Sequence, residues 1–204
     1  MSLFSFFNRL CGKSFTGQYG FVAIPDVDTR NDALEMGNAY DGGAEFTVKH
    51  PHITLFQAPV ADIPRGFVLQ TLNSLQFLVH HEVTHNEVGV FFDNWVLWLT
   101  DKDDEIMRAH SIARKMSDFL DQLAATTAAN SAVGLTIRER DLVRKHGTFL
   151  VGTDYMPHIT LAHAGSDIEA RHKFAELPGT IVQVAFVEFG EHGTIKRVIE
   201  SVQD

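Results

Sequence analysis

The sequence has little cysteine and no long apolar run, and each shortage excludes a class of protein. Cys11 is its only cysteine among 204 residues. An intrachain disulfide is therefore impossible, and a zinc site built on several thiolates is excluded. No apolar run approaches the roughly 20 residues of a membrane-spanning helix. We expect a cytoplasmic protein without a membrane span.

Positive charge is also scarce. Lys and Arg number 17 against 26 Asp and Glu, which gives a formal net charge of −9. A surface for duplex nucleic acid relies on many Lys and Arg contacts to phosphate, so no duplex partner is expected. A single nucleotide or an RNA end needs only a local basic patch, which this balance permits. The ordinary hydrophobic fraction of 45% predicts a folded protein, and we expect a monomer.

What the sequence does contain is a series of strand and helix patterns. A helix over 65–80 is indicated by apolar residues recurring every three or four positions, and Asp93-Asn94 predicts the turn of a hairpin. The expected strands are 19–24, 46–56, 83–92, 95–100, 148–163, 181–189 and 194–202, and the other expected helices are 28–40, 103–128 and 167–176. The order of these elements predicts a duplicated unit of about a hundred residues.

The predicted fold class is α+β. We expect two pseudo-symmetric lobes of mainly antiparallel sheet, with helices on the outside and a central active-site cleft, in a single domain over residues 18–204. Residues 1–17 are interpreted as an N-terminal extension. Leu3, Phe4, Phe7 and Leu10 could share one helical face there. A terminal helix or tail packed on the domain is therefore expected, with a short helix that touches lipid as the alternative.

One five-letter stretch, PHITL, occurs twice, at residues 51–55 and at residues 157–161. Side chains alternate between the two faces of a strand, so His and Thr point one way while Ile and Leu face the core. The outward pairs are His52 with Thr54 and His158 with Thr160. One such pair has a structural explanation, but packing gives no reason for the outward residues to recur. The repeat therefore predicts two halves of one site.

The chemistry of two such pairs suits phosphate. In-line displacement at phosphorus needs a base on one side and an acid on the other, and the ordinary pKa of histidine near 6.5 permits both. We predict His52 and His158 as the acid–base pair and Thr54 and Thr160 as substrate-binding donors to phosphoryl oxygens. The sequence does not distinguish base from acid.

No metal or cofactor is expected. Two histidines need a third ligand to hold zinc, and Asp62, Asp154 and His163 show no recognisable ligand spacing. On strict alternation His163 falls on the opposite face from His158, so we interpret it, like His50, as a local hydrogen-bonding residue. The other histidines, His192 among them, are expected on the solvent side.

Two further groups have competing interpretations. Phe91, Phe92, Trp95 and Trp98 are expected to build core, with a ring at the cleft edge stacking a nucleobase as the alternative. The basic stretch Arg138 to Lys145 is expected to be a solvated loop or helix end. A flexible basic flap that steers phosphate is the alternative.

With its two His-x-Thr strands, each followed by a leucine, the chain resembles the two-histidine (2H) phosphoesterase superfamily, over about residues 19–202. His163 stands where many relatives carry an arginine. The resemblance implies a bilobal fold and a phosphodiesterase that needs no metal. Its partner would be a nucleotide or RNA end with a 2′,3′-cyclic phosphate or 2′-5′ linkage. Alternatives are a non-catalytic binding module, a hydrolase of cyclic oligonucleotide signals and a reversible RNA ligase.

Overall fold

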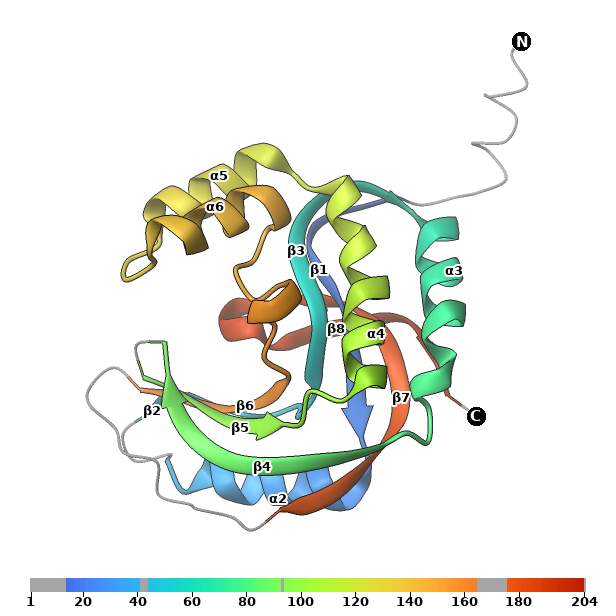
Figure 1. Cartoon of the computed structure of the whole chain (residues 1–204), viewed down its shortest axis with the longest axis vertical. Helices are drawn as coiled ribbons and strands as arrows, with labels where there is room; N and C mark the ends of the chain where they lie inside the picture. The colour runs from blue at the N-terminus through green and yellow to red at the C-terminus, as the bar shows by residue number, and fades with distance from the viewer. Residues whose placement is uncertain (1–13, 41–43, 93, 165–175, 204) are drawn as a thin grey trace.

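The computed structural model describes residues 14–40, 44–92, 94–164 and 176–203, and in this part of the chain eight strands form one antiparallel sheet (Figure 1). The strands are β1 (Ser14–Pro25), β2 (Ala44–Thr47), β3 (Ile53–Pro64), β4 (Glu82–Phe91), β5 (Trp95–Thr100), β6 (His158–Ala164), β7 (Leu177–Phe189) and β8 (Ile195–Val202). Their order is β1-β3-β6-β5-β4-β7-β8, with β2 beside β6. Because β1 also pairs with β7, the sheet closes on itself.

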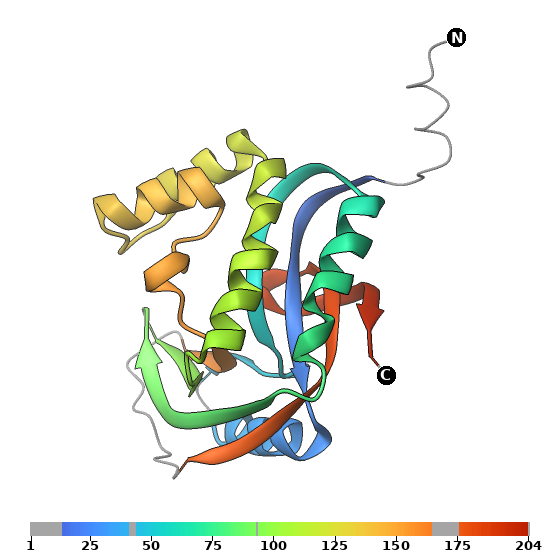
Figure 2. The same ribbon diagram turned by 45° about the vertical axis from the view of Figure 1, so that its right-hand side comes forward.

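The helices are α2 (Val27–Asn38), α3 (Arg65–Leu75), α4 (Asp104–Ala113), α5 (Gln122–Ser131) and α6 (Ile137–His146). Short 3-10 turns are η1 (Gln76–Leu78), η2 (Arg114–Phe119), η3 (Gly152–Asp154) and η4 (Glu191–Gly193). In both ribbon views α3 and α4 stand beside β1 and β3, α2 runs below β4, and α5 and α6 lie together at the opposite end (Figures 1 and 2). No helix in the described part of the chain is long and apolar enough to cross a membrane.

The strands divide into two lobes. The first lobe contains β1, β3, β7 and β8, and the second contains β2, β4, β5 and β6. The two PHITL strands, β3 and β6, belong to different lobes and meet through one backbone pair, Ile53 with Ile159. The lobes also join where β4 pairs with β7. The predicted α+β fold, with antiparallel lobes and helices outside, is confirmed.

The main core takes residues from both lobes and from the helices. Phe21 and Phe186 are fully buried, with ring centroids 5.0 Å apart, and Val68 of α3 and Ile106 of α4 belong to the same cluster. Burying a side chain of this size stabilises the fold by roughly 1.5–3 kcal/mol. The apolar faces behind the PHITL strands are part of this core, so Ile53 and Ile159 are fully buried.

The strand expected over 46–56 is wrong, because the chain changes lobes within it. β2 ends at Thr47, and the N–H of Val48 still donates to the Leu161 carbonyl of the second lobe at 2.7 Å. Pro51, which has no N–H and restricts the residue before it, then interrupts the strand. β3 begins at Ile53 in the first lobe and continues to Pro64.

The single helix expected over 103–128 is also wrong. After α4 and η2, Leu120 has extended backbone (φ −62°, ψ 129°) and forms a bridge to Val60 of β3. Asp121 then caps α5 with its side chain, which starts a new helix. Leu123, which the sequence placed in the apolar stripe, is 79% exposed.

The segment before the second PHITL differs from expectation too. The strand expected over 148–163 begins only at His158. The basic stretch Arg138 to Lys145, expected to be a solvated loop or helix end, lies within α6, so the alternative of a flexible flap is wrong. Thr136 and Glu139 form a reciprocal capping box at its start.

At the N-terminus, β1 begins at Ser14, inside the stretch assigned to the extension, while residues 1–13 lie outside the described residues. The helix expected over 167–176 falls on residues that the description does not cover, apart from Glu176.

A buried histidine makes the fold sensitive to acid. His85 on β4 is fully buried, its Nδ1 lies 3.0 Å from the Thr100 hydroxyl, and its ring lies 4.4 Å from the Trp98 ring. Burial lowers the pKa of His85 from 6.5 to about 4. The unfolded chain therefore binds a proton at a pH where the folded chain does not, and stability falls as the pH drops from 6.5 towards 4.

We expect the free energy of unfolding to fall by about 3 kcal/mol from this group alone over that pH interval. Denaturant titrations at several pH values measure it. His85→Gln, which keeps a polar group opposite Thr100 but cannot be protonated, should flatten the slope. An equal slope in wild type and variant would contradict this account.

Candidate active site

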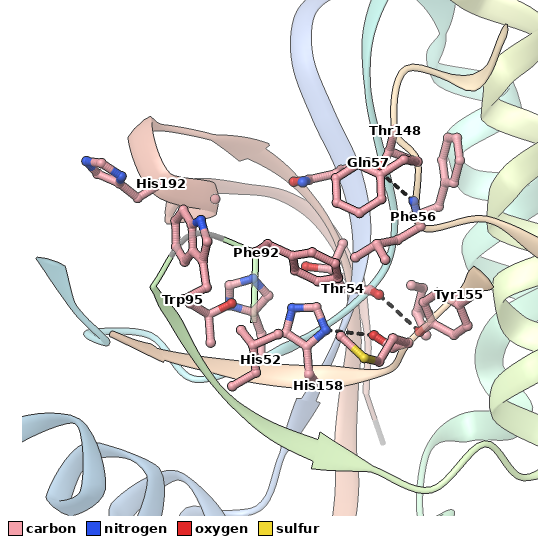
Figure 3. Close-up of a pocket in the computed structure, with 17 residues that line it drawn as sticks. His52, Thr54, Phe56, Gln57, Phe92, Trp95, Thr148, Tyr155, His158 and His192 are labelled. Carbon is pink, nitrogen blue, oxygen red and sulfur yellow. Dashed lines mark hydrogen bonds between the residues drawn. The ribbon is translucent and has the colours of Figure 1, made fainter. Parts of the chain in front are cut away.

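A cavity of about 290 Å³ lies where the two lobes meet, and all four predicted site residues line it. Figure 3 shows His52 and His158 beside one another, with Thr54 close to them. β1 pairs with β3 to hold the first motif, and β5 pairs with β6 to hold the second. The structure thus brings the pair His52 and Thr54 together with the pair His158 and Thr160, which comes from a distant part of the sequence.

The two imidazoles are oriented in the same way. His52 Nδ1 lies 2.7 Å from the carbonyl oxygen of His50, and His158 Nδ1 lies 2.6 Å from that of Met156. A carbonyl only accepts, so in both rings Nδ1 carries the proton. Each histidine bonds to the residue two positions before it, and in each the Nε2 atom is left for the cavity.

Enclosure changes the acidity of both rings. Burial lowers the pKa of His52 from 6.5 to about 4; the hydrogen bond to the His50 carbonyl raises it, and the charge of His158 lowers it. Burial also lowers the pKa of His158, against the effect of the Met156 carbonyl. An anion bound between the rings would favour protonation of either one.

The structural similarity between the two motif strands, β3 and β6, extends beyond their five identical residues. Between β1 and β3 the register slips at Leu55, and between β5 and β6 it slips at Leu161, so each leucine is the extra residue of a β-bulge. After each bulge the alternation of faces shifts by one. Gln57 and His163, each five positions after a motif histidine, consequently face the same side as that histidine, and Gln57 lines the cavity.

The face expected for His163 is therefore wrong, because strict alternation ignores the bulge; its interpretation as a local hydrogen-bonding residue stays a prediction. Its ring lies 4.4 Å from Trp95 and 5.7 Å from His192, both of which line the cavity. His192 is exposed, as expected, and it also lines the cavity from η4, with a positive φ of 55°. These three rings form one aromatic wall.

A second wall comes from the β4–β5 hairpin and the segment after α6. Phe92, which is 41% exposed, packs edge-on against Phe149 at 5.1 Å. Trp98, in contrast, is fully buried. The core interpretation thus holds for Trp98, whereas Phe92 and Trp95 line the cavity.

His110 and Tyr155 connect the two motif segments behind the cavity. His110 Nδ1 donates to the Leu55 carbonyl at 2.7 Å, and its Nε2 accepts from the Gly152 N–H at 3.1 Å. Its ring stacks on Tyr155 at 3.9 Å, and the Tyr155 hydroxyl donates to the Thr54 carbonyl at 3.0 Å. Burial lowers the pKa of His110, which preserves the neutral form that this pair of bonds requires.

Among the described residues, no group of three His, Cys, Asp or Glu side chains is placed to hold a metal ion. Asp154, considered as a third ligand, instead forms an ion pair with Arg138 at 2.5 Å. Arg144 pairs with Asp141 at 2.8 Å. The arginines of α6 are thus engaged locally and do not line the cavity.

The fold is similar to that of several solved structures. TT0787 of Thermus thermophilus superposes with a TM-score of 0.59 at 17% identity, covering 91% of this chain and 97% of that one. Escherichia coli LigT bound to 3′-AMP gives 0.57 at 10% identity, covering 93% and 98%. A protein described as a phosphoesterase gives 0.53 at 10% identity, covering 93% and 98%.

No protein-family model matches the sequence, and no curated protein does. The structural likeness nonetheless spans nearly the whole of each chain. It confirms the predicted α+β fold, which this chain shares with TT0787, LigT and the protein described as a phosphoesterase.

The acidity of the two histidines can be measured directly. In an NMR pH titration of the free protein, we expect His52 to titrate near pH 4 and His158 below 6.5. Replacing His158 with Gln should raise the pKa of His52, because a neighbouring positive charge is removed. His85→Gln, which changes another buried histidine, should leave His52 where it was. A His52 pKa at or above 6.5 would contradict this description.

Proposed function

We propose that the chain is a phosphodiesterase that hydrolyses a 2′,3′-cyclic phosphate or a 2′-5′ phosphodiester on a nucleotide or RNA end. The observation that supports it best is the matched pair of Nδ1–H bonds to backbone carbonyls, which leaves two Nε2 atoms for one cavity. A pure binding site gains little from two such imidazoles. Hydrolysis of a P–O bond needs both.

In this mechanism, water attacks phosphorus opposite the leaving ribose oxygen. Nε2 of one histidine takes a proton from the water, and Nε2–H of the other gives a proton to the leaving oxygen. The two imidazoles have equivalent hydrogen bonds, so they exchange roles in the reverse reaction. The hydroxyls of Thr54 and Thr160 donate to the non-bridging oxygens, where charge develops. The reaction needs no metal ion.

A nucleotide is a suitable ligand because the cavity joins polar and aromatic surfaces. Trp95 and Phe92 offer ring faces or edges on which a base can stack, and Gln57 offers an amide that can both donate and accept. Solved structures of LigT, which has the same fold, are described as complexes with 3′-AMP, ATP, NADP⁺ and phosphate. This likeness supports a phosphate-bearing nucleotide as the substrate here.

The variants His52→Asn and His158→Asn test the catalytic pair. The Asn amide can replace the Nδ1–H donor to the same carbonyl, but it has no counterpart of Nε2. We expect each to lower kcat on 2′,3′-cyclic AMP by about 10²–10⁴-fold with little change in Tm. The control His81→Ala removes an imidazole that pairs with Asp103, away from the cavity, and should keep activity.

Full activity in His158→Asn would refute the mechanism, and so would a wild type that binds the cyclic nucleotide without product. The assay should contain excess EDTA. Activity that disappears in EDTA and returns with a divalent cation would contradict the metal-free reaction.

The pH profile follows from the two lowered pKa values. The free enzyme must hold one proton on the histidine pair, so kcat/KM should be bell-shaped with its maximum below pH 6.5. It should fall below about pH 4, the pKa of His52, and again as the pH rises through the lowered pKa of His158. The kcat profile should lie at higher pH, because bound phosphate favours the protonated ring. A kcat/KM that rises steadily to pH 8 would exclude an imidazolium acid.

A further inference from the structure

A second hollow, of about 440 Å³, is lined by positive charge. Among the described residues, four cationic side chains and no Asp or Glu line it: Arg30 of α2, Lys49, and Lys196 and Arg197 of β8. His50 lies among them. We call this hollow the basic groove. In a chain with a net charge of −9, such a concentration of positive charge in one concave place is unusual.

Nearby carboxylates compensate only part of this charge. Lys196 and Arg197 share a single partner, Glu188, at 2.5 and 2.8 Å. The bond from Arg30 Nε goes to a backbone carbonyl, that of Asp26, at 3.3 Å, which does not neutralise the guanidinium. Lys49 is exposed and lies beside His50 at the groove. A concave surface with cations of one sign and apolar walls attracts anions from solution.

The basic groove and the cavity have no lining residue in common, but two short segments of the chain contribute neighbouring residues to both. The segment that leads from β2 into β3 contributes Lys49, His50 and Pro51 to the groove, and its next residue, His52, lines the cavity. The second segment is the turn before β8 together with the start of that strand. His192 and Gly193 of the turn line the cavity, and residues 195–198 of β8 line the groove. The His50 carbonyl that orients His52 therefore belongs to a residue of the groove. The cavity and the groove therefore lie beside the same two segments of the chain.

We propose that the basic groove binds a second phosphate group of the substrate, the one attached to the 5′ oxygen of the nucleotide whose cyclic phosphate lies between His52 and His158. In an RNA strand this phosphate is the phosphodiester before the terminal nucleotide. The inference rests on the proposed function, and it makes an RNA end, rather than a nucleoside cyclic phosphate, the preferred substrate class. The acidic remainder of the surface repels longer stretches of nucleic acid, so recognition stops near the end of the strand.

The test compares three substrates in the wild type and in Lys49→Gln/Lys196→Gln. They are adenosine 2′,3′-cyclic phosphate, the same nucleotide with a 5′-phosphate, and the dinucleotide ApA ending in a 2′,3′-cyclic phosphate. We expect the wild type to prefer the last two by about tenfold in kcat/KM, since an exposed ionic contact contributes a factor of about two to five. The double variant should lose this preference and keep its rate on the first substrate.

The control Lys102→Gln/Lys145→Gln removes two lysines that line neither hollow, and it should retain the preference. The wild-type preference should also shrink as salt rises from about 50 mM to about 500 mM. A higher kcat/KM on the 5′-phosphorylated mononucleotide than on adenosine 2′,3′-cyclic phosphate would show that a single phosphate is sufficient. A higher kcat/KM on the dinucleotide alone would show that a strand is required. Equal losses on all three substrates, or an unchanged preference in the groove variant, would overturn the proposal.

A binding measurement separates failure of the groove from failure of the proposed reaction. A labelled RNA tetramer ending in a 3′-phosphate is titrated with each protein and followed by fluorescence anisotropy, which needs no turnover. Affinity should fall about tenfold in the groove variant and stay near the wild-type value in the lysine control. If the cyclic substrates are not hydrolysed but this loss appears, the groove proposal stands and the phosphodiesterase fails. Equal affinity in all three proteins overturns the groove.

Discussion

The single backbone pair between Ile53 and Ile159 is the contact on which the site depends, because it joins the two lobes where their motif strands meet. Both isoleucines are fully buried, so each strand is fixed by its apolar side while its polar side faces the cavity. The hydroxyl of Tyr155, which donates to the Thr54 carbonyl, ties the second motif segment to the first strand. His110 of α4 binds both segments from behind. Small errors in position cost much activity at a reacting phosphorus, and these contacts limit such errors.

Electrostatics follows from the same enclosure. Burial lowers the pKa of both motif histidines, so both rings of the free site favour the neutral form, although the proposed reaction requires a proton on one of them. In that reaction an anionic substrate would stabilise the protonated ring. The basic groove next to the cavity offers a separate attraction for phosphate, in a chain whose overall charge would repel nucleic acid. In the two proposals, catalysis and recognition of the second phosphate therefore belong to two different hollows beside the same segments of the chain.

Much of the fold was predictable where a pattern is local. The 65–80 helix, the hairpin around Asp93-Asn94 and the final two strands agree with the described elements within a few residues. Errors arose where a tertiary contact overrides a continuing pattern. Leu120 ends a helical stripe because it pairs with Val60, and Pro51 divides a β pattern because the chain changes lobes there. The capping box of Thr136 and Glu139 was visible in the sequence and would have identified α6.

By itself the sequence determined the α+β class and the four residues of the repeated motif, because strand alternation and a repeated polar pair are local properties of the chain. Only the tertiary structure decided what surrounds them. The bulges at Leu55 and Leu161 turn Gln57 and His163 towards the side of the motif histidines. Neither bulge can be recognised from the amino-acid sequence. The aromatic walls, the clamp of His110 and Tyr155, and the basic groove join residues that are far apart in the chain. Their meeting depends on how the lobes pack, and that is a property of the whole fold.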